Sequence, residues 1–338
     1  MVGTMTAPAQ RVLSGIQPTG QKHLGNYFGA IRQHIALQDE FPGECFYFIA
    51  DYHALTTVHH GDSMRESVQE LARTYLALGL DPDKALLFRQ SDVPEVTELA
   101  WLLSSVTGMG LLERAHAFKD KVAQGLQPSV GLFGYPVLMA ADILIYQSTL
   151  VPVGKDQVQH VEMAQDMATH FNQAYSPAAP VLRRPECRLA ATAYVMGTDG
   201  RKMSSSYGNF IPLFEAGKPL RKRIGAIVTD STPLGQPLDP ERCNVFALLG
   251  LFCEPAEIER VAAWYRSGQR DGQPFGYGHA KQLLAERIES HFAEARGRRD
   301  ELLAHPERVE QVLRRSAERA RSEAQHTMAR CRRACGLT

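Results

Sequence analysis

The chain has 338 residues, of which 44% are hydrophobic and 22% charged, and its formal net charge is zero. This composition excludes a chain that is disordered throughout, and the length suffices for one large domain with a smaller one beside it. No run approaches the roughly 18 apolar residues that a membrane-spanning helix needs. Residues 1–11 lack the basic and apolar segments of a secretory signal. Six scattered cysteines without a paired framework indicate reduced thiols and hence a cytoplasmic location.

Short apolar segments alternate with helical patterns from residue 11 to residue 89. The strand candidates are 11–15, 45–50 and 85–89, and the helix candidates between them are 23–38 and 63–80. This alternation predicts an α/β fold with a doubly wound parallel sheet. In such a sheet ligands bind beyond the carboxyl ends of the strands, so the turn after the first strand is the first candidate binding site.

The remainder of the chain is predicted to be mostly helical. A helix-rich stretch spans 96–146, and a strand at 151–154 leads into a helix that starts near Asp156. Further helix candidates lie at 221–227, 244–253, 256–266 and 280–330. We therefore predict a Rossmann-like catalytic domain with a helical insertion at 11–206 and a helical domain at 207–338. Residues 281–338 contain thirteen Lys and Arg and nine Asp and Glu, a net charge of +4, which fits a nucleic-acid surface or an ordinary solvated helical face.

The turn after the first predicted strand carries the first motif, SGIQPTG at 14–20 followed by HLGN at 23–26. Its glycines and proline form a turn that opens onto a helix, whose free N–H groups and positive dipole favour phosphate. Gly25 lets a group such as a stacked adenine approach the backbone, and His23 can donate a hydrogen bond to developing phosphoryl charge. Taken alone, the motif is better explained as a strand-to-helix turn with a capping role.

The second motif is RKMSSS at 201–206, which follows glycines at 197 and 200 and is expected on a flexible loop. Lys202 and the hydroxyl groups of Ser204 and Ser206 can neutralise and hydrogen-bond a triphosphate. Taken alone, this motif is better explained as an ordinary polar surface loop.

Together, HLGN after the first strand and KMSSS near residue 200 resemble the HIGH and KMSKS signatures of class I aminoacyl-tRNA synthetases. The neighbouring sequence is similar to the tryptophanyl-tRNA synthetase family in DYHALT at 51–56, ERAHAFKDK at 113–121, GLFGYPVLMAADIL at 131–144 and VPVGKDQVQH at 151–160. The resemblance begins near residue 12 and is strongest before residue 210. It implies activation of L-tryptophan with ATP and Mg²⁺, transfer to tRNA(Trp), a homodimer, and a C-terminal helical part that reads the anticodon.

Tyr135, Met139 and Asp142 are spaced so that they share one helical face, with Pro136 expected in the first turn of that helix. An aromatic ring, a thioether and a carboxylate on one face form an apolar slot with one hydrogen-bond acceptor. Indole has the matching shape, a flat apolar body with a single N–H donor. The resemblance implies that Asp142 accepts this N–H, whereas the residues alone also fit core packing beside a polar helix residue.

The resemblance assigns roles to further residues in both motifs and beyond them. It implies catalytic roles for His23, Lys121, Lys202, Ser204 and Ser206, and no metal ligand. It implies ATP contacts from Gln17, Pro18, Thr19, Gly25, Asn26, Gly154, Lys155, Asp156, Val195, Lys202, Met203, Ser204, Ser205 and Ser206. It implies tryptophan contacts from Gly15, Gln17, His53, Tyr135, Met139, Asp142, Val153 and Gln157, with Gln157 holding the amino group.

Four residues depart from the pattern of the family. Ser205 stands where the signature usually carries a second lysine, which removes one positive charge directed at the phosphates. Lys155 replaces a frequent glutamate, Leu13 a common phenylalanine, and Ala117 a glutamine near the phosphates. These departures leave open an auxiliary or non-catalytic relative that binds tryptophan. A nucleotidylyltransferase with an HxGH-like motif is a further alternative, but the long helical region and the Tyr135–Asp142 segment argue against it. A tyrosine-specific synthetase would need polar groups placed to receive a phenol hydroxyl, and the sequence shows no clear set of them.

Overall fold

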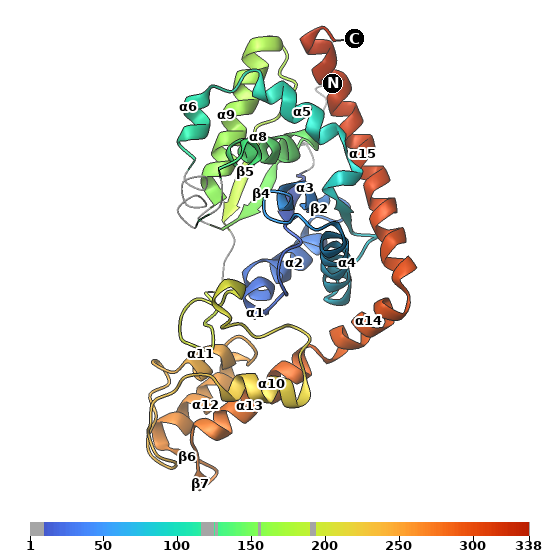
Figure 1. Ribbon diagram of the computed structural model, residues 1–338. Helices are drawn as coiled ribbons and strands as arrows, with labels where there is room; N and C mark the ends of the chain where they lie inside the picture. The colour runs from blue at the N-terminus through green and yellow to red at the C-terminus, as the bar shows by residue number, and fades with distance from the viewer. Residues whose placement is uncertain (1–9, 116–124, 126–127, 155–156, 190–193, 338) are drawn as a thin grey trace, which may run out of the picture.

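The computed structural model describes residues 10–115, 125, 128–154, 157–189 and 194–337 (Figure 1). Its centre is a parallel sheet of five strands, β1 (Val12–Ile16), β2 (Cys45–Ile49), β3 (Ala85–Arg89), β4 (Leu150–Val153) and β5 (Glu186–Leu189). The strand order is β3-β2-β1-β4-β5, so the order reverses between β1 and β4. The predicted doubly wound α/β fold is therefore confirmed.

Helices cover the sheet and form a second lobe below it in Figure 1. The helices beside the sheet are α1 (Leu24–Asn26), the π-helical turn η1 (Tyr27–Ile31), α2 (Arg32–Glu40), α3 (Asp51–Ala54), α4 (Gly61–Ala77), the 3₁₀ turn η2 (Gln90–Asp92), α5 (Glu95–Ser104), α6 (Met109–Glu113), α8 (Val130–Ile145) and α9 (Val158–Tyr175). After them come the 3₁₀ turn η4 (Ser205–Tyr207), α10 (Gly217–Gly225), α11 (Asn244–Leu249), α12 (Pro255–Ser267), the hairpin β6 (Gln269–Arg270) and β7 (Gln273–Pro274), α13 (Tyr277–His291), α14 (Ala293–Ala304) and α15 (Pro306–Cys335).

The strand β5 was not predicted, because it lacks the buried apolar run of the central strands. It lies at the edge of the sheet and pairs with β4 alone. Its terminal residues Glu186 and Leu189 are exposed, whereas every residue of the central strand β2 is buried. An edge strand with one partner needs fewer apolar side chains, and its sequence signal is correspondingly weak.

The prediction that Pro136 occupies the first turn of its helix is wrong. The helix α8 begins at Val130, and the Ser129 side chain caps it by accepting a hydrogen bond from the backbone N–H of Leu132 at 3.1 Å. Pro136 therefore lies inside the helix, where it cannot donate to the carbonyl of the preceding turn. Tyr135 and Met139 still follow one another by one turn on the same face.

The predicted helix at 280–330 is three helices in the structure, α13, α14 and α15. The break before α15 follows from Pro306, because a proline disfavours the helical conformation of the residue before it. The break before α14 falls at Phe292, whose buried ring contacts Tyr27 and Phe252. The packing of this ring and the proline together turn the chain back toward the sheet.

The region from residue 207 to the C-terminus contains two parts with different packing. Helices α10 to α13 surround their own apolar core, which includes Leu220, Leu248 and Leu284. The long helix α15 instead runs beside the sheet, on the side of β3 (Figure 1, red). Its residues Ala317 and Ala320 are buried in the same apolar core as the helices of the α/β part. The helix α14 joins the two parts.

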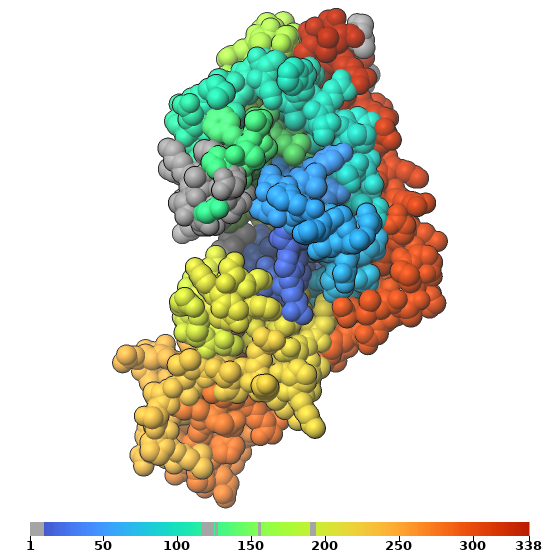
Figure 2. Space-filling model, in the orientation of Figure 1, coloured from blue at the N-terminus to red at the C-terminus, as the bar shows by residue number. Residues whose placement is uncertain are grey.

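The surface is hollowed where the α/β part meets the segment around residues 195–215 (Figure 2, yellow-green). Dark blue atoms from the first part of the described chain are visible there. Among the described residues, no helix combines the length and the apolar character that crossing a membrane requires.

Candidate active site

A cavity of about 470 Å³ lies at the carboxyl ends of β1 and β4, where the strand order reverses. This is the expected position of a ligand in an open α/β sheet. Its walls come from β1, β2, β4 and the helices η1, α2 and α8. Many of the predicted binding residues line it together, namely Gly15, Gln17, His53, Tyr135, Met139, Val153, Gly154 and Gln157.

The wall formed by β1 and β2 requires a glycine at position 15. A Cβ atom on Gly15 would lie 2.3 Å from Cζ of Phe48, because the Phe48 ring occupies the space beside it. These two residues are direct partners in the register of β1 and β2, and both line the cavity. Any side chain at position 15 would displace the ring, so Gly15 allows an aromatic surface to form this wall.

The opposite wall is formed by α8, which presents Tyr135 and Met139 to the cavity. The hydroxyl group of Tyr135 lies 2.8 Å from Nε2 of His160, a buried residue of α9. The Tyr135 ring also lies edge-on to the ring of His53, with 6.3 Å between the ring centres. The position of the Tyr135 ring is thus fixed by polar contacts at its far end while its face remains beside the cavity.

Asp142 lies deeper on α8 and is 1% exposed. Its Oδ2 atom lies 2.9 Å from Nε2 of His53, and the amide nitrogen of Gln90 donates to both Oδ1 and Oδ2 at 2.9 Å. Burial raises the pKa of Asp142, and the hydrogen bonds from His53 and Gln90 oppose that rise. Asp142 is not one of the residues lining the cavity, whereas its partner His53 is.

Gln90 is missing from the predicted site residues. It follows directly after β3 and is 1% exposed. The carboxyl ends of parallel strands meet at one edge of the sheet, so a buried polar residue directly after a predicted strand is a signal that could have identified it.

The turn of the first motif is held by a lysine that was not predicted either. The Nζ atom of Lys22 donates to the carbonyl oxygens of Gln17 at 3.2 Å and Thr19 at 2.7 Å. Burial lowers the pKa of Lys22 to about 8. The three predicted residues Gln17, Pro18 and Thr19 thus belong to a turn whose carbonyl groups point toward an ammonium group.

His23 and Asn26 occupy the start of α1. His23 is 5% exposed, and burial together with the charge of Lys22 lowers the pKa of His23 to about 4, so the imidazole is neutral at pH 7. Its Nδ1 atom has no hydrogen-bond partner among the described residues. The Oδ1 atom of Asn26 accepts from the backbone N–H of His23 at 3.1 Å, so this side chain also stabilises the first turn of the helix.

The second motif forms a tight loop around Asn209. The backbone N–H of Met203 donates to the carbonyl of Val195 at 2.9 Å, and both of these side chains are buried. The side chain of Asn209 donates to the carbonyl of Lys202 at 3.1 Å and accepts from the N–H of Ser204 at 2.8 Å. The backbone is therefore ordered by a residue outside the motif that the sequence pattern did not indicate.

The polar side chains of this loop remain available to a ligand. Lys202, Ser205 and Ser206 are exposed, while the hydroxyl oxygen of Ser204 accepts from the N–H of Ser206 at 3.2 Å. An exposed ammonium group and hydroxyl groups can bind phosphate oxygens without first breaking internal contacts.

The structure brings the two motifs together. A Cβ atom on Gly25 would lie 2.9 Å from Nδ1 of His23 and 3.5 Å from Cβ of Met203, so the backbone of α1 lies against the second motif. A Cβ atom on Gly20 would lie 3.4 Å from the hydroxyl oxygen of Ser205. The backbone N–H of Leu24 also donates to the carbonyl of Ile211, just beyond the second motif, at 3.0 Å. The helix start and the hydroxyl-rich loop thus form one site beside the cavity.

Three predicted site residues, Lys121, Lys155 and Asp156, lie outside the described residues. Among the residues that are described, no group of three or more His, Cys, Asp and Glu side chains could hold a metal ion.

Comparisons with known proteins agree with this geometry. A family model described as "tRNA synthetases class I (W and Y)" matches residues 6–293. The tryptophan–tRNA ligase of Rhodopirellula baltica is 55% identical over 327 residues, which are 97% of this chain and 99% of that protein. The crystal structure of tryptophanyl-tRNA synthetase from Campylobacter jejuni complexed with ADP and tryptophan is similar at a TM-score of 0.90 and 46% identity, covering 97% of this chain and 100% of the other. The tyrosyl-tRNA synthetase of Archaeoglobus fulgidus has the same fold at a TM-score of 0.64 and 22% identity. The chain therefore belongs to the class I tRNA synthetases specific for tryptophan and tyrosine.

Proposed function

We propose that this chain is a tryptophan–tRNA ligase, which activates L-tryptophan with ATP to form tryptophanyl-adenylate and then transfers the tryptophanyl group to tRNA(Trp). The observation that carries the proposal is the cavity at the β1–β4 switch point, with Tyr135 and Met139 in its wall and Asp142 behind them. The relatives at 46% and 55% identity that match nearly the whole chain are tryptophan–tRNA ligases, which supports the same substrate.

The proposed amino-acid site combines apolar walls with one polar end. The indole ring lies between the α8 wall and the wall formed by Gly15 and Phe48, and its N–H donates to Asp142. His53 and Gln90 hold the Asp142 carboxylate, and the Gln157 side chain binds the substrate amino group. A site built around one hydrogen bond rejects a substrate lacking the donor, because the buried carboxylate is then left without its partner.

The proposed ATP site lies where the two motifs meet. The substrate carboxylate attacks the α-phosphorus of ATP in line, and pyrophosphate leaves. Lys202 neutralises charge on the leaving phosphates, Ser204 and Ser206 hydrogen-bond them, and neutral His23 donates an N–H. Gly154 and Asp156 bind the ribose, and Lys121 reaches the triphosphate. No residue acts as a covalent nucleophile, because placing the two reactants and stabilising the charge suffices for this reaction.

We propose that Mg²⁺ enters with the nucleotide. The described residues of the phosphate site contribute an imidazole, hydroxyl groups and ammonium groups rather than a cluster of carboxylates. Such a donor set would hold the phosphates of the nucleotide, and a magnesium ion that entered with them would neutralise part of their charge.

Three further properties follow from the proposed function. The helical region after residue 207 binds the anticodon part of tRNA(Trp), and the six free cysteines fit a cytoplasmic location. We propose a homodimer, supported by exposed apolar side chains beside the amino-acid site. Val130 at the start of α8 is 90% exposed and Leu55 after α3 is 55% exposed, and such residues are typical of a surface that a second protein covers.

Pyrophosphate exchange tests the proposed function, with each of the twenty amino acids supplied separately. Exchange with tryptophan alone, followed by charging of tRNA(Trp), is the expected result. Exchange with tyrosine would overturn the indole assignment. Exchange with none of them, together with binding of tryptophan, would favour a non-catalytic relative, which is supported by Ser205 in place of the second lysine and by the neighbouring departures from the family pattern. The full-length match to tryptophan–tRNA ligases favours a synthetase over a nucleotidylyltransferase.

A further inference from the structure

Gln90 is held as a hydrogen-bond donor toward Asp142. Its amide nitrogen contacts both carboxylate oxygens at 2.9 Å, and its amide oxygen accepts from the backbone N–H of His53 at 3.4 Å. Rotating the amide by half a turn would bring its oxygen against the carboxylate, where two acceptors repel each other. The orientation of the carboxylate therefore depends on where Gln90 lies, and Gln90 is the first residue of the short turn η2.

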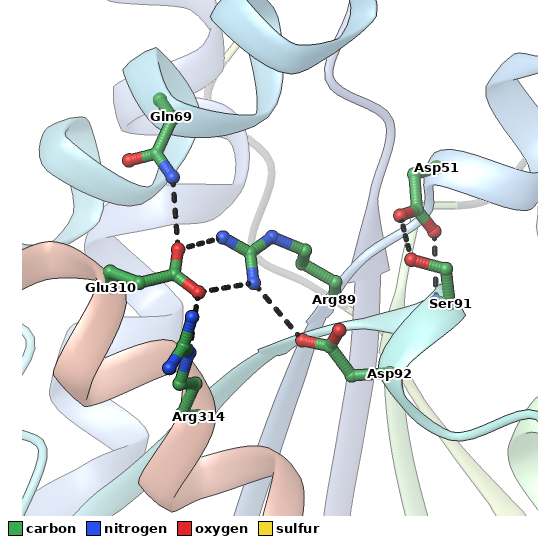
Figure 3. Close-up of polar contacts among 7 residues, drawn as sticks. All are labelled: Asp51, Gln69, Arg89, Ser91, Asp92, Glu310 and Arg314. Carbon is green, nitrogen blue, oxygen red and sulfur yellow. Dashed lines mark hydrogen bonds and ion pairs between the residues drawn. The ribbon is translucent and has the colours of Figure 1, made fainter.

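The turn η2 is fixed on both sides of Gln90 (Figure 3). After it, Ser91 donates its backbone N–H to Oδ1 of Asp51 at 3.0 Å, and its hydroxyl group donates to the other oxygen of the same carboxylate. Before it, Nη1 of Arg89 donates to Oδ2 of Asp92 at 3.2 Å and so closes the turn on itself. Three residues make too short a helix to hold a fixed position unaided, so these side chains determine where Gln90 lies.

Arg89 is in turn held from the C-terminal helix. Its guanidinium group makes a two-pronged contact with the carboxylate of Glu310 on α15, including an Nη1–Oε1 distance of 3.3 Å (Figure 3). Glu310 also accepts from Nε of Arg314 at 2.9 Å and from the amide of Gln69 at 3.3 Å. The Arg89 side chain is only 17% exposed, so this pair is partly shielded from water and is stiffer than an ordinary surface pair.

We infer that Arg89 and Glu310 are positioning residues for tryptophan recognition. They anchor η2 to the C-terminal helix, and η2 places Gln90 on the carboxylate that accepts the indole N–H. This inference rests on the proposed function of the Asp142 site. It assigns α15 a part in amino-acid selection, although the helix lies on the far side of β3 from the cavity. Loss of the pair loosens Gln90, so the carboxylate samples orientations that no longer suit the indole.

The test uses the full-length enzyme with Arg89→Met, Glu310→Gln and the double variant, assayed by pyrophosphate exchange at varied tryptophan and varied ATP. The matched control is Glu98→Gln, which breaks the ion pair that α15 makes with α5 through Arg332 and leaves η2 intact. Each single variant is expected to raise KM for tryptophan about fivefold, an effect typical of residues that act through a neighbour, and to leave KM for ATP within about twofold. The double variant should resemble the singles, because the two residues act as one unit.

If Arg89 and Glu310 only stabilised the fold, their variants would show a different pattern of KM values. If Arg89→Met and Glu310→Gln raise both KM values together, or match Glu98→Gln in every parameter, the inference is overturned. Arg89→Lys supplies a variant that retains the charge and should recover part of the affinity for tryptophan. Calorimetric titration with L-tryptophan measures the dissociation constant of each variant directly and should rank the variants as their KM values for tryptophan do. A wild-type enzyme that does not use tryptophan would contradict the proposed function itself, whereas a tryptophan-using wild type with unchanged variants would contradict this inference alone.

Discussion

The imidazole of His53 lies 2.9 Å from the carboxylate of Asp142, and both side chains are buried. With the two contacts from Gln90, residues in the described part of the chain fill three of the roughly four acceptor positions of this carboxylate and leave one on Oδ1. Asp142 lies next to His53, which lines the apolar cavity, and one free acceptor in this position is what an indole N–H requires. The same three contacts stabilise a carboxylate that burial would otherwise destabilise in its charged form.

Asp142→Ala tests this relationship most directly. Removing the carboxylate leaves the indole N–H, the His53 ring and the Gln90 amide without a partner, so kcat/KM for tryptophan should fall by about 100-fold or more. The dissociation constant for ATP should change by less than about threefold, since the residues of the two motifs that form the phosphate site do not contact Asp142 in the described part of the chain. Pyrophosphate exchange gives the first quantity and nucleotide titration the second. Equal losses of both would contradict the indole assignment.

Ser205→Lys tests the missing charge of the second motif. Ser205 is exposed, and its hydroxyl oxygen is near the backbone of Gly20 in the phosphate-binding turn. A lysine there adds one positive charge beside the leaving phosphates, and we expect kcat for pyrophosphate exchange to rise by up to about tenfold. The matched control is Leu234→Lys, which adds the same charge at a residue that is 63% exposed in the second lobe. An equal rise in both variants would show a nonspecific effect of charge.

The central strands of the fold could be predicted because the apolar pattern that identifies a buried strand lies within the residues of each strand itself. The strand at 85–89 was predicted with its observed bounds, since four apolar residues and one arginine lie between residues that are typical of turns. The edge strand β5 and the turn at Phe292 could not be predicted, because each depends on a partner far away in the sequence. A prediction from local pattern therefore describes the buried centre of the sheet better than its edge.

The candidate site shows the same division. The predicted residues that line the cavity were assigned through the family resemblance of local sequence motifs, whereas Gln90 and Lys22 were not assigned. Gln90 becomes a partner of Asp142 only when β2 lies between β1 and β3. In the sequence, Lys22 is one more polar residue of a turn. Only the structure shows that its ammonium group donates to the carbonyl oxygens of Gln17 and Thr19. The position of Gln90 directly after a strand marks it as a candidate, but the partners of both residues follow only from tertiary contacts.

Lys22 gives a prediction for the dependence of stability on pH. Burial lowers its pKa from 10.5 to about 8, so between these values the folded protein releases a proton that the unfolded chain retains. The unfolding free energy contributed by this group therefore rises with pH in that window. Between pH 7.5 and pH 9.5 the rise should be about 2 kcal/mol. Urea unfolding of the wild type and Lys22→Met at both pH values should show this difference. Lys84→Met, at an exposed lysine, should retain the wild-type slope.

Ala320 tests whether α15 belongs to the catalytic body. Its side chain is fully buried in the core shared with the sheet and with α5 and α8, and α15 lies directly against β3. Leucine at this position has no room, so Ala320→Leu should lower the unfolding free energy by about 1–3 kcal/mol. Ser322→Leu places the same side chain at an exposed position two residues further along the helix and should stay within about 0.5 kcal/mol of the wild type.

The comparison between these two variants depends on where the helix packs. A helix that belonged only to the second lobe would tolerate leucine at both positions, and the unfolding curves of the two variants would then coincide. If only Ala320→Leu lowers the unfolding free energy, the contact between α15 and β3 belongs to the same cooperative folding unit as Arg89 and Gln90. The same buried contact that stabilises this unit then keeps Glu310 at the distance its ion pair with Arg89 requires.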